Sequence, residues 1–131
     1  MKDIRDAMLL FNSCAVHVRR TDYVKLGHEL DLSYYESAIE GIKERNKDIE
    51  WFIFSDDIEW CEQYLPIRNR TFCHFHDYQD LWLMTHAKHI IMANSTFSFW
   101  GQYLNRNLKS VVMPKDWKGV PSIINDNGEY K

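Results

Sequence analysis

The chain has 131 residues, which suits a single domain with a sizeable core. Its 16 basic and 19 acidic residues give a formal net charge of -3. This balance excludes a global field that would attract nucleic acid or an anionic membrane. An anionic ligand must therefore be held by a local cluster of cations.

The cysteines and the apolar runs indicate the compartment. Cys14, Cys61 and Cys73 are odd in number and form no CxxC pair, which predicts reduced and buried thiols. No run approaches the roughly 18 apolar residues of a membrane span. We therefore expect a soluble, cytoplasmic protein without a transmembrane segment.

The first half of the chain alternates helical and strand patterns. Ser33 and Glu36 form an S-x-x-E pattern that predicts a capped helix, and Ser55 can cap a later helix that Pro66 ends. The expected elements are a helix over 4–11, a strand over 14–18, a polar loop over 19–31, a helix over 33–46, a strand over 51–54 and a helix over 55–65.

The second half continues this alternation. The expected elements are a strand over 71–75, a helix opening at 77, a strand over 89–93, a short aromatic helix over 97–104 and a strand over 109–113. Five strands alternating with helices predict an α/β fold. We expect a Rossmann-like, three-layer domain with an open, mostly parallel sheet.

Polar groups follow each predicted strand. They comprise residues 19–22, 55–57, 77, 94–96 and 115–116. Because the carboxyl ends of parallel strands meet at one edge of a sheet, we expect these groups to lie together. Sheets of this kind bind their ligands at that edge.

The group after the first strand points to an anionic ligand. Arg19 and Arg20 suit a diphosphate, because each guanidinium offers a planar fork of donors. His17 lies two residues before Arg19 on the same strand face and would donate a hydrogen bond to a phosphate or a sugar. The alternatives are solvated loop arginines and a core histidine with its hydrogen bonds satisfied.

Neither a metal site nor a glycine loop is predicted. The six histidines match no zinc spacing, and Asp56 and Asp57 are adjacent rather than in an Asp-x-Asp pattern. With no GxGxxG or Walker lysine loop, phosphates would be held by the arginines and by the turn over 94–98, which precedes a helix. Plain helix capping is the alternative for that turn, and a solvated first turn is the alternative for the two aspartates.

Three ordered motifs resemble those of the α-1,2-fucosyltransferases, glycosyltransferase family 11. They are HVRRTDY over 17–23, FSDD over 54–57 and DLWLMTHAKHIIMANSTFSFWGQYLN over 80–105, followed by KSVVMPKDW. The resemblance extends from Cys14 to Trp117. It implies that residues 1–131 are the GDP-fucose-binding, Rossmann-like domain of a GT-B-type inverting transferase, with the acceptor-side domain absent from this chain.

The resemblance also implies roles for particular residues. Asp80 would select guanine by accepting hydrogen bonds from its N1 and N2 groups. Because adjacent residues that leave a strand diverge, we also expect only one arginine to face the diphosphate: Arg19, which shares a strand face with His17, would stabilise the leaving group while Arg20 braces the fold. The alternative for Asp80 is a helix cap. Contacts with GDP-fucose are implied for His17, Arg19, Arg20, Asp80, Asn94, Ser95, Thr96 and Phe97.

The implied reaction transfers L-fucose, with inversion, to the 2-hydroxyl of a galactoside. No metal or other cofactor is expected, because arginines can stabilise the leaving-group charge. The base that takes the acceptor proton would be Asp22 or Glu29, or a residue of the absent half. The implied partners are GDP-fucose and a galactoside or glycan acceptor without nucleic acid, and members of the family can associate peripherally with membranes.

Two other functions fit the sequence. The short chain favours a non-catalytic nucleotide- or glycan-binding module. A fragment of a nucleotide-sugar epimerase or phosphatase is a further alternative.

Overall fold

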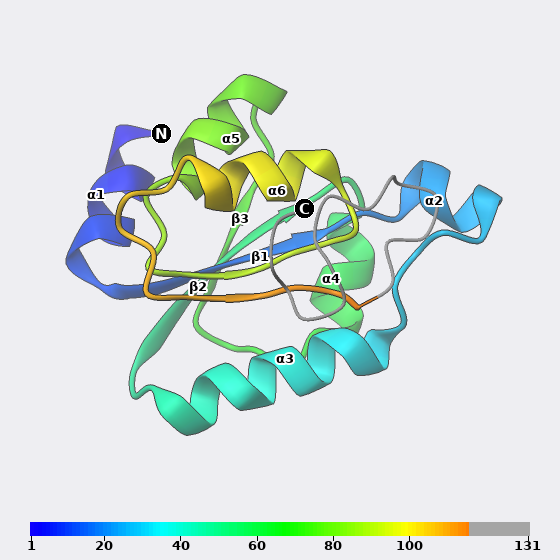
Figure 1. Cartoon of the computed structure of the whole chain (residues 1–131), viewed down its shortest axis with the longest axis horizontal. Coiled ribbons are helices and arrows are strands. Elements are labelled where there is room, and N and C mark those ends of the chain that lie inside the picture. Colours follow the sequence, from blue (N-terminus) through cyan, green and yellow to red (C-terminus); the bar gives the residue numbers. More distant parts are fainter. Residues whose placement is uncertain (116–131) are drawn as a thin grey trace.

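The computed structural model describes residues 1–115 as an α/β domain (Figure 1). Five strands form one sheet in the order β3-β2-β1-β4-β5, and every neighbouring pair is parallel. The strands are β1 (Asn12–Val18), β2 (Ile49–Ser55), β3 (Arg70–Cys73), β4 (His89–Ile91) and β5 (Ser110–Val112). The helices are α1 (Lys2–Leu10), α2 (Thr21–Leu26), α3 (Leu32–Arg45), α4 (Ile58–Tyr64), α5 (Asp77–Met84) and α6 (Thr96–Tyr103).

Helices cover both faces of the sheet. Figure 1 shows α1, α5 and α6 over one face and α3 over the other. Along β1, Cys14 and Val16 belong to the core cluster under α3 and α4, whereas Ala15 belongs to the cluster under α1, α5 and α6. Strand residues that alternate between two covered faces are expected in a parallel sheet. The Rossmann-like, three-layer prediction is confirmed.

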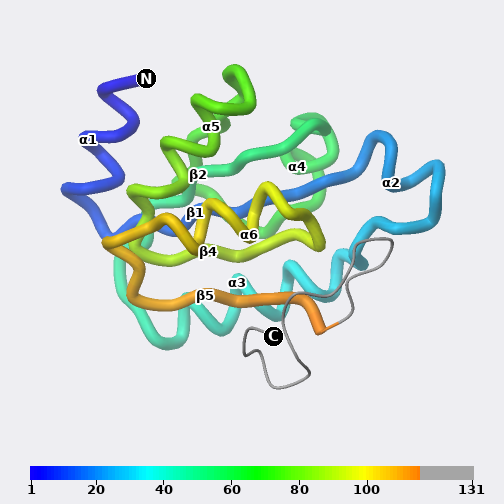
Figure 2. Tube along the Cα trace, turned by 45° about the horizontal axis from the view of Figure 1, so that its top comes forward, coloured from blue at the N-terminus to red at the C-terminus, as the bar shows by residue number. Residues whose placement is uncertain are grey.

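The sheet topology fixes where a ligand can bind. After β3 the chain returns across β2 and β1 to form β4, so the strand order reverses between β1 and β4. Ligands of open α/β sheets bind beyond the carboxyl ends of the strands at such a reversal. Figure 2 shows α2 beyond that end of β1.

Helix α3 provides much of one core. Its buried residues are Tyr35, Ala38, Ile39 and Ile42, which confirms the predicted apolar stripe. The predicted capping box of Ser33 and Glu36 is wrong. The helix begins earlier, at Leu32 with Asp31 as the N-cap residue, because Leu32 already packs against the core.

The predicted loop over 19–31 contains helix α2, so that prediction is wrong in part. Asp56 accepts hydrogen bonds from the N–H groups of Arg20 and Thr21, which would otherwise be unpaired at the start of this helix. Gly27 ends the helix in the left-handed conformation, at φ 72°. A distant carboxylate thus stabilises a helix that has no apolar stripe of its own.

Ser55 does not cap α4, contrary to the prediction. It is the last residue of β2, and its Oγ accepts a hydrogen bond from the N–H of Asp57. Asp57 is the N-cap residue, since its Oδ1 accepts from the N–H of Trp60 at 3.1 Å. The helix ends at Tyr64, one residue before the predicted end at Leu65, and Pro66 follows it as predicted.

Several other predictions can be compared directly. Cys14, Cys61 and Cys73 are buried and form no disulfide, as predicted. The third and fourth strands end at Cys73 and Ile91, each two residues before the predicted end. Among residues 1–115, no helix is long and apolar enough to cross a membrane. Asp116, predicted in the polar group after the last strand, lies outside the described residues.

Candidate functional site

A cavity of about 320 Å³ opens at the carboxyl ends of β1, β2 and β3. Its volume lies at the lower end of the range for small-molecule sites. Five predicted site residues meet there: His17, Arg19, Asp22, Asp80 and Phe97. The remaining lining residues are Thr21, Phe54, Ser55, Asp56, His74, Phe75 and Asp77.

Arg19 reaches the cavity from the end of β1. Its guanidinium makes a two-point ion pair with Asp22, with Nε at 3.1 Å and Nη2 at 2.9 Å from the two carboxylate oxygens. Nε also lies 3.5 Å from Oδ2 of Asp56. The hydrogen bond to Asp22 raises the pKa of Arg19 and, reciprocally, lowers the pKa of Asp22. An anion that binds this Nε–Nη2 edge of the guanidinium must therefore displace Asp22.

Arg20 does not line the cavity. Its guanidinium carbon lies 4.2 Å from the ring centroid of Trp60 on α4, and its Nε lies 3.5 Å from Oδ2 of Asp57. Stacking of a guanidinium on an aromatic face is a stabilising contact. The two neighbouring arginines therefore diverge, with Arg19 at the cavity and Arg20 packed against α4.

Asp56 organises the turn that presents Arg19. Besides the two main-chain N–H groups, its carboxylate accepts a hydrogen bond from Oγ1 of Thr21 at 2.7 Å. Together with the guanidinium of Arg19, these hydrogen bonds compensate the negative charge of Asp56. The sequence did not predict this role of Asp56 in holding the turn, since a solvated first turn also fits its pattern.

His17 forms the floor of the cavity and is 6% exposed. Its Nδ1 is hydrogen-bonded to Oγ of Ser98, and its ring lies 5.0 Å from that of Phe97 between centroids. Burial, followed by the charge of Arg19, lowers the pKa of His17 to about 4. The ring is therefore neutral at physiological pH.

Asp80 borders the cavity from α5. Its Oδ1 accepts a hydrogen bond from the N–H of Phe75 at 3.2 Å, and burial raises its pKa. The N-cap residue of α5 is His76, whose N–H donates to Oε1 of Gln79. Asp80 thus holds the turn before the helix and does not act as its N-cap.

The turn over 94–96 does not line the cavity. The Asn94 amide donates to the main-chain oxygen of His28, and Ser95 caps α6 by accepting from the N–H of Phe97. Thr96 is the first residue of that helix. Contacts of Asn94, Ser95 and Thr96 with a ligand stay predictions.

Glu29, the second predicted candidate for the base, lies apart from the cavity lining. Its Oε2 is buried and has no hydrogen-bond partner within residues 1–115. Asp22 is thus the one candidate of the two that borders the cavity.

The charges of the cavity are uneven. Among its described lining residues, Arg19 is the one arginine or lysine, whereas Asp22, Asp56, Asp77 and Asp80 are acidic. An anionic group can therefore bind only beside Arg19, which Asp22 and Asp56 already contact. The carboxylates of Asp77 and Asp80 on α5 suit hydrogen-bond donors, such as a nucleobase or sugar hydroxyls. Within residues 1–115, no group of three or more His, Cys, Asp or Glu is arranged to hold a metal ion.

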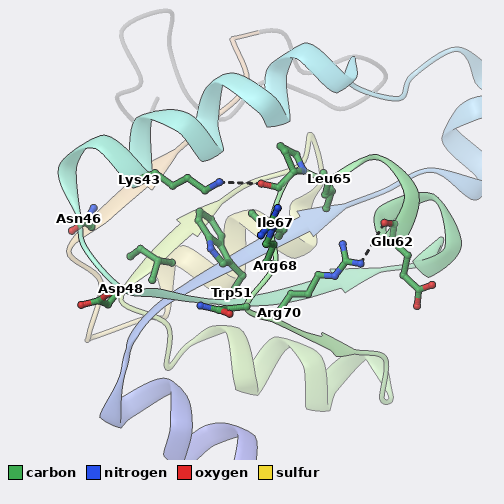
Figure 3. A pocket seen from close by; sticks show the side chains of 12 residues that line it. Lys43, Asn46, Asp48, Trp51, Glu62, Leu65, Ile67, Arg68 and Arg70 are labelled. Atoms are coloured by element: carbon green, nitrogen blue, oxygen red, sulfur yellow. Dashed lines mark hydrogen bonds between the residues drawn. The ribbon is translucent and has the colours of Figure 1, made fainter.

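A larger cavity of about 720 Å³ opens near the amino ends of β2 and β3 (Figure 3). Lys43 donates from Nζ to the main-chain oxygen of Pro66 at 3.0 Å, and Arg70 donates to that of Glu62 at 3.4 Å. These cations thus already bond main-chain carbonyls. No predicted site residue lines this cavity, so the smaller one is the candidate site.

The chain matches glycosyl transferase family 11 over residues 9–128. It is 38% identical to an alpha-1,2-colitosyltransferase of Escherichia coli, over 88% of this chain and 44% of that protein. It is 34% identical to the O-antigen biosynthesis glycosyltransferase WbnK of Escherichia coli, over 81% of this chain and 39% of the relative. It is 30% identical to a mouse galactoside alpha-(1,2)-fucosyltransferase 1, over 68% of this chain and 27% of the relative. The chain thus spans less than half the length of these relatives.

Proposed function

The chain belongs to glycosyltransferase family 11, and we propose that it binds GDP-fucose as the donor-side domain of a GT-B-type galactoside 2-α-L-fucosyltransferase. One observation supports this best: a guanidinium fork and a neutral histidine border the same cavity at the carboxyl ends of the parallel strands. This is where a nucleotide diphosphate would bind in such a fold.

Arg19 is the residue that would stabilise the leaving group. As the bond between fucose C1 and the diphosphate oxygen breaks, negative charge grows on the diphosphate while the sugar becomes cationic. A fixed guanidinium stabilises that charge more in the transition state than in the ground state. Since Arg19 provides both N–H donors in one plane, no metal ion is required for this step in the proposal.

Asp22 is the proposed base, because it borders the cavity beside Arg19. While paired with Arg19, it holds its proton weakly and is a poor base. A diphosphate that takes the Arg19 fork frees the carboxylate. The acceptor oxygen attacks C1 from the face opposite to the diphosphate, so Asp22 can accept its proton only after the carboxylate has left Arg19 and turned to that face.

Asp80 is the proposed selector of guanine. A carboxylate can accept hydrogen bonds from N1 and N2 of guanine together, whereas adenine has no matching pair of donors. We expect Asp80→Asn to reduce the preference for GDP over ADP in competitive binding assays. A folded Asp80→Asn protein with an unchanged preference would show that Asp80 serves the turn at Phe75 alone.

A second candidate sugar is favoured by the colitosyltransferase relative. Binding assays compare the affinity of the chain for GDP-fucose with its affinity for a nucleotide-linked colitosyl donor. Stronger binding of the colitosyl donor would replace fucose in the proposal and retain the nucleotide site.

A non-catalytic binding module makes a different prediction for the full-length protein. If an upstream domain is joined to this chain, we expect fucose transfer to a β-galactoside, with little effect of a chelator. Donor binding without transfer would favour the binding module. Strong inhibition by EDTA, rescued by manganese, would contradict a metal-free mechanism.

A further inference from the structure

Ser98 connects the cavity to the sheet, although it does not line the cavity. It lies in the first turn of α6 and is 0% exposed. Its Oγ accepts a hydrogen bond from the N–H of Ala93 at 3.1 Å and is also bonded to Nδ1 of His17. One buried hydroxyl thus joins the end of β4 to a side chain of β1.

The direction of the His17 bond follows from counting donors and acceptors. The Ala93 N–H can only donate, so Ser98 Oγ is its acceptor. A buried hydroxyl hydrogen also needs an acceptor, and within residues 1–115 the other atom bonded to Oγ is His17 Nδ1. Ser98 therefore donates to Nδ1, and the ring hydrogen is placed on Nε2.

The opposite tautomer would leave the serine hydrogen without a partner. If Nδ1 carried the hydrogen and donated to Oγ, the hydroxyl would have no acceptor among the described residues. An unpaired buried hydroxyl is costly. The tilted contact with Phe97 further limits the orientation of the ring.

Nε2 is the ring nitrogen that is left for a ligand. His17 lines the cavity, and no group within residues 1–115 bonds its Nε2. Resting on the proposed function, we propose that Ser98 is a positioning residue: it holds His17 in the Nε2–H tautomer, so that the ring presents a single N–H donor to the phosphate or sugar of the nucleotide-sugar donor.

The chain contains a matched control. Ser13 on β1 is also 0% exposed, donates to the main-chain oxygen of Met8 at 2.8 Å and accepts from the N–H of Lys88 at 3.1 Å. Ser13→Ala thus removes an equivalent buried hydroxyl that has no contact with His17. Any general cost of losing such a hydroxyl appears in both variants.

The test uses two-bond ¹H–¹⁵N NMR spectra, which distinguish protonated from unprotonated ring nitrogens, with His17→Gln identifying the His17 signals. We expect the Nε2–H pattern in the unmutated protein and in Ser13→Ala. Ser98→Ala should give a mixture of tautomers and weaken GDP-fucose binding roughly two- to tenfold relative to Ser13→Ala, the effect of about one hydrogen bond.

Two results would overturn the inference. One is an Nδ1–H pattern of His17 in the unmutated protein, which does not depend on the folding of Ser98→Ala. The other is a Ser98→Ala protein with the unmutated pattern and the affinity of Ser13→Ala. If GDP-fucose does not bind to any of these proteins but the pattern still depends on Ser98, the proposed function fails and the tautomer assignment is supported.

Discussion

At the scale of single residues, the protonation of His17 makes the folding stability depend on pH. Its pKa is about 4 in the folded protein, below its ordinary value of 6.5, chiefly because of burial. As pH falls through about 6.5 the unfolded chain takes up a proton, whereas the folded protein does not until about pH 4. Folding stability is therefore lost over this window as pH falls.

This linkage gives the first prediction. Between pH 7 and pH 5, His17 should cost about 2 kcal/mol of folding free energy. Urea unfolding at both pH values measures the loss of folding free energy for the unmutated protein and for His17→Gln. The variant should lose less stability on acidification. His89, whose pKa is also lowered by burial, should leave a residual slope in both proteins. Equal slopes would show that His17 is not buried in a neutral form.

Asp22 gives the second prediction, because it both competes for Arg19 and is the proposed base. Asp22→Asn should strengthen GDP binding only slightly, because the ion pair between Arg19 and Asp22 is exposed. In the full-length protein, the same variant should abolish most transfer. Unchanged turnover at saturating donor would assign the base to another residue.

At the scale of elements, α5 and α6 pack closely at Gly101. A Cβ atom at this position would lie too close to Sδ and Cγ of Met84, which is itself fully buried. Gly101→Ala should therefore destabilise the fold by about 1–3 kcal/mol. Thermal or urea unfolding measures the change.

Gly41 on α3 is the control for this prediction. A Cβ atom there would meet only the guanidinium of Arg45, at 3.8 Å. Gly41→Ala should stabilise the protein by up to about 1 kcal/mol, because alanine favours a helix over glycine. If Gly101→Ala raises the free energy of unfolding as Gly41→Ala does, a Cβ atom fits at position 101, and the close packing of α5 on α6 does not require glycine there.

Most of the helices and strands could be predicted from the sequence, and those that could not depend on distant residues. Periodicity predicted α3 and the five strands, because continuous apolar runs and helical stripes are local patterns. Helix α2 was not predicted, since it depends on Asp56, 35 residues away from Thr21. The capping box at Ser33 failed for a related reason: packing of Leu32 on the core decided where α3 begins.

The site was predictable in part. Placing polar residues after strands located His17, Arg19 and Asp80, because parallel strands bring their carboxyl ends together. The divergence of Arg19 and Arg20 follows from the geometry of adjacent residues. The role of Ser98 was not foreseen, since its bond to His17 spans 81 positions and its hydroxyl is typical of a helix start.

At the scale of the whole molecule, the two neighbouring arginines have separate roles. Arg19 borders the cavity, and Arg20 packs on Trp60. Loss of Arg19 should therefore affect binding, and loss of Arg20 should affect stability by about 0.5–2 kcal/mol, the range of a guanidinium on an aromatic ring.

Calorimetric titration of GDP-fucose into the unmutated protein, Arg19→Ala and Arg20→Ala is the most direct test, with the folded state of each sample verified by circular dichroism. We predict that the unmutated protein binds, that Arg19→Ala loses at least tenfold in affinity, and that Arg20→Ala keeps most of its affinity while losing stability. Absence of binding by the folded, unmutated protein, or equal affinity of Arg19→Ala and the unmutated protein, would contradict the account.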